Sequence, residues 1–140
     1  AASGPYGDKR TFFRVCPMPS IVDLRNQFHV DHVFPISRFS ASKLRKSGFD
    51  ENEIPDLAEL ANELPNLQLL EGAMNNEKRA KLPGDWLADV FGDDKKRKNY
   101  LDIHVLEGLP IDLSGFEGFA KHRRDKLRSL IETKLRQIGE

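Results

Sequence analysis

The chain has 140 residues, of which 39% are hydrophobic and 31% are charged, and its formal net charge is zero. This length suits one compact domain with a modest core, and the composition is typical of a globular protein and not of a disordered one. The sequence contains no run of about 18 apolar residues, the length that a membrane helix needs. Its single cysteine, Cys16, excludes a disulfide framework and a four-cysteine zinc site.

The N-terminus carries no recognisable targeting signal. Residues 1–7 have no basic segment followed by an apolar run, so we expect no signal peptide. The sequence does not begin with methionine, and we expect it to be a fragment of a larger multidomain protein. We interpret Cys16 as a small buried hydrophobe, and a reducing cytoplasm is the expected location.

The charges are unevenly distributed along the chain. Residues 48–76 contain seven acids and no lysine or arginine, whereas residues 95–98 are all basic and residues 121–136 hold seven bases against two acids. Folded onto different faces, these segments would offer nucleic acid a positive surface despite the zero net charge. The alternative interpretation is that the charge runs are solvated helix faces.

Apolar periodicity and the positions of proline and glycine predict a single α+β domain built from short elements. The run at 67–70 is too short for a helix between Pro65 and Gly72, so a buried strand is expected there. Residues 100–118 are expected to be loop-rich, and Trp86 to be a core residue. In chain order the expected elements are an irregular arm (1–20) with a strand at 11–15, a helix or turn (21–28), a strand from Phe28 to a loop before Pro35, a helix (37–47), a helix from Pro55 to before Pro65, the strand 67–70, a helix capped by Asn75 or Asn76 and running through Lys81, a helix from about Asp85 to Gly92, and an amphipathic helix over about 119–138.

The order strand, connection, strand, turn, helix carries residues suited to the hydrolysis of phosphodiester bonds. An imidazole is suited to take a proton from water at neutral pH, so His32 is the candidate general base. The carboxylate of Asp31 and the amide of Asn75 are hard oxygen donors that suit Mg²⁺ or Mn²⁺. Lys78 lies three residues after Asn75, on the same face of a helix, and offers a positive charge to a phosphate.

His29 is harder to assign. It lies two residues before Asp31, so both point to one face of a strand, whereas His32 points the other way unless the strand has already turned into a loop. His29 is therefore a further metal ligand, a residue that orients one, or a strand histidine that faces solvent. His104 is interpreted as a surface histidine or one with its hydrogen bonds satisfied.

Residues 28–35 (FHVDHVFP) together with 64–83 (LPNLQLLEGAMNNEKRAKLP) resemble the HNH nuclease superfamily. The central Asn of that motif falls on Asn66, and its third position is Asn75 in place of the commoner histidine, as in the HNH domains of CRISPR effector nucleases. The run at 66–70, the Lys-x-Leu-Pro ending and Trp86 look most like the C-terminal nuclease domains of modular anti-phage defence proteins. Those proteins include GmrSD-type restriction enzymes and nickases that sense phosphorothioated DNA.

The resemblance implies a fold and a set of roles. The fold would be a ββα-metal core within residues 28–86, a two-stranded antiparallel hairpin plus a helix, surrounded by further α-helices. His32 would be the general base, and Asp31 with Asn75 would hold one Mg²⁺ or Mn²⁺ ion, with no structural zinc. Asn66 would tie the loop between the strands and orient His32 through a hydrogen bond with its main chain. The residues expected to contact nucleic-acid phosphates are Arg38, Lys78, Arg79 and Lys81.

The expected activity is therefore nicking of DNA strands within a bacterial restriction or anti-phage system. The expected partners are DNA, the other domains of the parent protein and, for double-strand cleavage, a second copy of the chain, with no membrane. One alternative is a non-catalytic DNA-binding or partner-binding module that keeps the fold. Another is that Asn66 and Asn75 only cap a strand and a helix, and that Asp31 and His32 are a structural pair.

Overall fold

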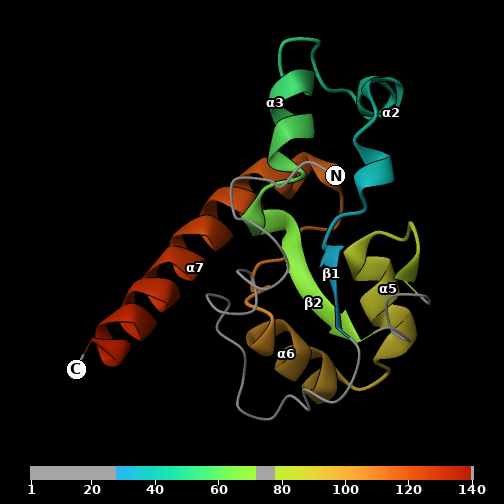
Figure 1. Cartoon of the computed structure of the whole chain (residues 1–140). Coiled ribbons are helices and arrows are strands. Elements are labelled where there is room, and N and C mark those ends of the chain that lie inside the picture. The colour runs from blue at the N-terminus through green and yellow to red at the C-terminus, as the bar shows by residue number, and fades with distance from the viewer. Residues whose placement is uncertain (1–27, 72–77, 140) are drawn as a thin grey trace.

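The structure, a computed structural model, describes residues 28–71 and 78–139 of the 140-residue chain. Within these residues it is an α+β protein with five α-helices and one two-stranded antiparallel sheet, which confirms the expected class at that level (Figure 1). Several expected features lie outside the described residues: the strand at 11–15, Cys16, most of the helix or turn at 21–28, the turn at Gly72 and the helix start at Asn75 or Asn76.

The described elements occur in the following order along the chain. They are β1 (Phe28–His32), the 3-10 turn η1 (Ile36–Arg38), α2 (Ala41–Lys46), α3 (Ile54–Leu60), η2 (Leu64–Asn66), β2 (Leu67–Glu71), α5 (Pro83–Val90), α6 (Asp94–Ile103), η3 (Leu113–Gly115) and α7 (Phe116–Ile138).

The sheet consists of the two strands that the sequence predicts. β1 runs antiparallel to β2, with Phe28 opposite Glu71 and His32 opposite Leu67. Residues 68–70 of β2 are each at most 6% exposed. Both faces of this strand are therefore covered, which explains why its sequence is a nearly continuous apolar run and not an alternating one.

The segment between the two strands contains the short helices α2 and α3, which pack against the core. Pro55 lies in the first turn of α3, where its missing N–H costs no helical hydrogen bond. The expected helix over residues 37–47 is divided into η1 and α2. Leu57 of α3 and Leu44 of α2 point into the core, so both short helices are held by tertiary packing.

Two expectations about the second half of the chain are wrong. The helix expected to run through Lys81 does not reach that residue, because Arg79 has a positive φ of 47°, which ends a right-handed helix. The region from residue 100 onward was expected to be loop-rich, but Tyr100 lies inside the helix α6, which runs to Ile103. The sequence of α6 is mostly charged and has no apolar stripe; its N-terminus is capped by the side chain of Asp93, which accepts from the amide of Lys95.

Aromatic side chains dominate the core. Phe34 packs edge-on against Phe116 of α7, with ring centroids 5.3 Å apart, and Trp86 packs against Tyr100 at 5.5 Å. Trp86 is 2% exposed, which confirms its expected place in the core.

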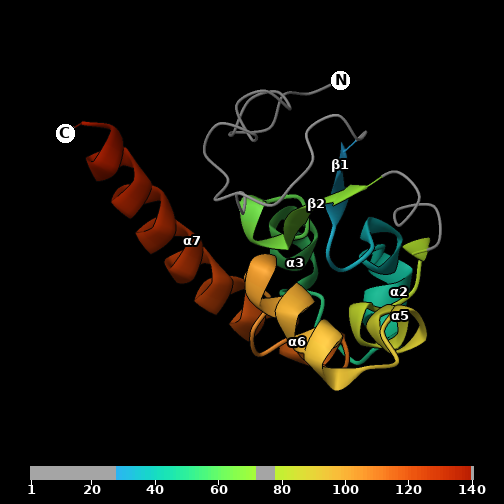
Figure 2. The ribbon, with the colours of Figure 1, turned by 90° about the horizontal axis from the view of Figure 1, so that it is seen from below.

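The C-terminal helix α7 begins three residues before its expected start at about 119. Its first half packs on η2, η3 and α3, and its second half extends away from the rest of the domain (Figures 1 and 2). Leu135 and Ile138, two apolar residues of the expected amphipathic helix, are 58% and 79% exposed. Among the described helices, none is both long and apolar enough to cross a membrane.

Candidate active site

Asn66 joins the exit of β1 to the end of α3. Its side chain is fully buried; the Oδ1 atom accepts from the amide of Phe34 at 2.8 Å, and Nδ2 donates to the carbonyls of Phe34 at 3.0 Å and Ala61 at 2.8 Å. Its own carbonyl accepts from the amide of Val33 at 2.7 Å. Asn66 therefore contacts the loop after β1 at Val33 and Phe34 and the end of α3 at Ala61, and the expected hydrogen bond with the main chain of His32 is not among these contacts.

Lys78 fixes the end of β1 from the other side. Its ammonium donates to Asp31 Oδ2 at 2.8 Å and to the carbonyl oxygen of His32. The Lys78 side chain is only 1% exposed, and that of Asp31 is 18% exposed. Burial lowers the pKa of Lys78, and the Asp31 carboxylate opposes this shift. We expected Lys78 to contact a phosphate, but the structure encloses its charge, so this geometry favours a role in holding Asp31 and the strand end.

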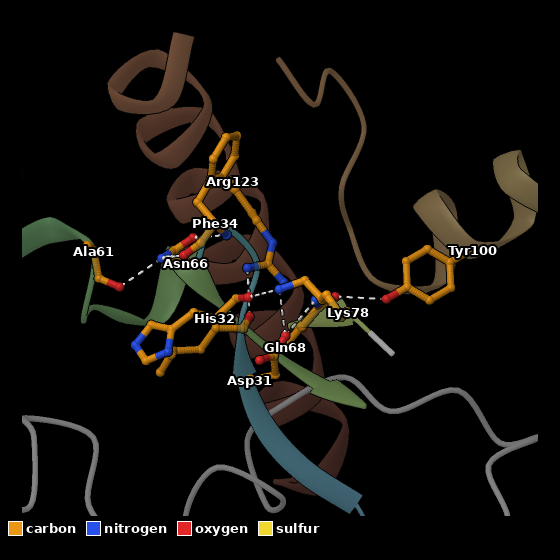
Figure 3. A network of polar contacts seen from close by, with 10 residues as sticks. Asp31, His32, Phe34, Ala61, Asn66, Gln68, Lys78, Tyr100 and Arg123 are labelled. Atoms are coloured by element: carbon orange, nitrogen blue, oxygen red, sulfur yellow. Dashed lines mark hydrogen bonds and ion pairs between the residues drawn. The ribbon is translucent and has the colours of Figure 1, made fainter. Parts of the chain in front are cut away.

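His32 and Asp31 lie side by side in sequence but point apart. In Figure 3 the imidazole of His32 extends away from the cluster of Asp31, Gln68 and Lys78, as expected for neighbouring positions of a strand. The imidazole is half-buried, and its Nε2 lies 3.1 Å from Oδ1 of the exposed Asn62. It therefore reaches the surface, where it can exchange a proton with water.

Two buried polar residues that the sequence did not single out connect Asp31 to α6. Gln68, opposite Asp31 in the sheet, places Nε2 3.4 Å from Asp31 Oδ2, and Tyr100 donates its hydroxyl to Gln68 Oε1 at 2.9 Å (Figure 3). Burial, with the Asp31 charge adding to it, raises the pKa of Tyr100. The Tyr100 hydroxyl therefore stays protonated and remains a donor.

Arg123 of α7 is the third residue that the sequence did not single out. Its guanidinium donates to the carbonyls of Pro65 and Leu67 at the start of β2 and of His104 and Val105 after α6, at distances of 2.7 to 3.1 Å. The sequence does contain a sign of this buried role, because Arg123 lies within the apolar stripe of α7. The residues on that buried face are Phe116, Phe119, Ala120, Arg123 and Leu127. A charged residue in such a stripe requires buried acceptors.

The other expected site residues are placed as follows. His29 lies on the Asp31 side of β1, opposite Leu70, and is half-buried. Arg38 donates through Nε to the carbonyl of Ala80 at 3.1 Å, which brings it beside the exposed Arg79 and Lys81. Lys81 is also paired with Asp89 at 2.7 Å. Asn75 lies outside the described residues.

The residues present fit a weakly liganded divalent cation. Among the described residues, both hydrogen bonds to the Asp31 carboxylate go to Oδ2, and none goes to Oδ1. The described part of the chain has no group of three or more His, Cys, Asp or Glu side chains that could hold a metal. One carboxylate, with an amide from Asn75, is a donor set that Mg²⁺ accepts because it keeps several of its waters.

His104, which lies against Tyr100, should make the folded state less stable at acid pH. Its ring stacks on Tyr100, with centroids 4.1 Å apart, and burial, aided by the Arg123 charge, lowers the pKa of His104 to about 4. The ordinary pKa is about 6.5, so between pH 6.5 and 4 the unfolded chain binds a proton that the folded chain does not. The free energy of unfolding should therefore fall as the pH is lowered through this range, by up to about 3 kcal/mol from this residue.

His104→Phe keeps the ring stack and removes the titration. We expect urea denaturation to show a smaller loss of stability between pH 7 and pH 4.5 for this variant than for the wild type. Equal losses in the two proteins would contradict the assignment.

No protein-family model matches this chain, and no curated protein matches it. A groove between α6 and α7, of about 520 Å³, is lined by residues such as Leu101, His122 and Leu130 and contains none of Asp31, His32, Asn66, Gln68, Lys78 and Tyr100. The candidate functional residues are therefore those gathered at the end of β1.

Proposed function

We propose that this chain is a metal-dependent endonuclease domain of the HNH type that nicks DNA. The observation that supports the proposal is that four motif residues from three separate segments meet at the end of β1, where His32 joins the other three through its main-chain carbonyl and its imidazole points to the other face. Asp31 and His32 end β1, Asn66 fixes the loop that follows them, and Lys78, which comes after β2, bonds to both Asp31 and the carbonyl of His32. The meeting of these residues at one strand end supports the proposal that they serve one site.

His32 is the proposed general base. When its Nε2 carries the proton and donates to Asn62 Oδ1, Nδ1 is left as the basic atom that removes a proton from water. Asp31 and Asn75 would hold the divalent cation, and Lys78 keeps the Asp31 carboxylate in place. When bound, such an ion polarises the scissile phosphate and stabilises charge on the leaving oxygen.

Three cations near the site, the half-buried Arg38 and the exposed Arg79 and Lys81, are proposed to bind the DNA backbone. Arg38, Arg79 and Lys81 lie together where Arg38 meets the carbonyl of Ala80, and backbone contacts of this kind position a duplex without reading its sequence. A domain of this size with one site would cut one strand at a time. Target choice would then come from other domains of a restriction or anti-phage protein, and double-strand cleavage from a second copy.

Plasmid cleavage tests the proposal. Supercoiled plasmid incubated with the protein and Mg²⁺ or Mn²⁺ should be converted to open circles, and EDTA should abolish the conversion. Asn75→Ala should require a higher metal concentration than the wild type, because it removes one proposed ligand. A wild type that shifts plasmid in a gel but never nicks it would instead support a non-catalytic DNA-binding module.

A further inference from the structure

Behind Asp31 lies a chain of buried hydrogen bonds that the proposed nuclease chemistry does not itself require. It runs from the hydroxyl of Tyr100 in α6, through the amide of Gln68 in β2, to Oδ2 of Asp31 in β1. Gln68 and Tyr100 are 3% and 7% exposed, so these hydrogen bonds are shielded from water. Buried polar groups in such a place are costly unless their partners are fixed.

The chemistry of these groups determines which atom donates and which accepts in each hydrogen bond. An ionised carboxylate only accepts hydrogen bonds, so the group of Gln68 that faces Asp31 must be its NH₂. Its carbonyl oxygen then faces Tyr100, which must donate. Tyr100 therefore fixes the orientation of the Gln68 amide, and that amide, together with Lys78, fixes Oδ2 of Asp31.

We propose that Gln68 and Tyr100 are positioning residues that hold the Asp31 carboxylate with Oδ1 turned toward a bound divalent cation, a role that rests on the nuclease function proposed above. With two donors on Oδ2, rotation of the carboxylate would break two hydrogen bonds. Residues that orient a metal-binding carboxylate from behind typically alter metal affinity by about 10- to 100-fold when they are removed.

Mn²⁺ binding to the DNA-free full chain, followed by the EPR signal of free Mn²⁺, tests this without any cleavage. Gln68→Leu should weaken binding by about 10- to 100-fold, and Tyr100→Phe by a smaller factor, because it frees the amide without deleting it. The double variant should bind like Gln68→Leu alone, since Tyr100 acts only through Gln68. Phe91→Leu is the matched control: it disturbs the ring that packs 5.2 Å from Tyr100 but leaves the hydroxyl in place, so its affinity should match the wild type.

Each outcome has a separate meaning. Asp31→Asn should abolish the Mn²⁺ site; if the wild type binds Mn²⁺ no better than this variant, the proposed function and the positioning role both fail. If binding depends on Asp31 but Tyr100→Phe matches Phe91→Leu, only the positioning role is overturned. Urea denaturation of all variants identifies any loss of folding, and Tyr100→Phe, which removes one atom, keeps the test valid if Gln68→Leu does not fold.

Discussion

His32→Ala should lower the rate of plasmid nicking by about 100- to 10,000-fold, the usual contribution of a general base. The imidazole is half-buried and its one hydrogen bond within the described residues is to an exposed side chain, Asn62, so its removal should leave the fold intact. DNA binding should persist, because the expected phosphate contacts lie elsewhere. The measurement is the initial rate of open-circle formation at saturating Mg²⁺.

His29→Ala is the matched control for this variant. It removes the same side chain from the same strand, three residues earlier and opposite Leu70. We expect it to retain cleavage within a few-fold of the wild type and to show that the loss in His32→Ala is specific. Equal rates for His32→Ala and the wild type would remove His32 from the mechanism. Equal losses in both variants would point to a general disturbance of β1 or to a role of His29 as a further metal ligand.

The parts of the fold that could be predicted are those fixed by local pattern. Proline marked the start of α3, apolar spacing marked α7, and a short apolar run between Pro65 and Gly72 marked β2. α6 was missed because its helix depends on a capping side chain and on the packing of Tyr100 among aromatic rings that lie elsewhere in the sequence. Such stabilisation leaves no apolar period in the sequence.

The candidate site also has parts that could be predicted from the sequence and parts that could not. Asp31, His32, Asn66 and Lys78 could be selected because their spacing matches a motif, and the structure brings them together. Their contacts could not be predicted, since Asn66 bonds to main-chain atoms and Lys78 is buried by segments far away in sequence. Gln68 looked like one polar residue in an apolar strand, and only its register opposite Asp31 gives it a role.

The burial of Lys78 leads to the second large prediction, which separates a positioning lysine from a phosphate-binding one. Lys78→Met leaves the carboxylate of Asp31, 18% exposed, with Gln68 as its remaining described donor, and it leaves the carbonyl of His32 without its ammonium partner. Loss of one member of a largely buried pair should lower the free energy of unfolding by about 2 to 4 kcal/mol in urea denaturation. Adding Asp31→Asn should recover part of that loss, because neither partner is then charged.

Lys81→Met provides the contrast, because Lys81 is 49% exposed and its ion pair with Asp89 is at the surface. A surface pair contributes at most about 1 kcal/mol, so stability should hardly change. A cation that touches the DNA backbone should instead weaken binding across all sequences and make binding less sensitive to salt. If Lys78→Met showed this second pattern with unchanged stability, the ammonium would have to leave Asp31 for a phosphate when DNA binds. The arrangement at the end of β1 would then be the resting form of a site that rearranges on its substrate.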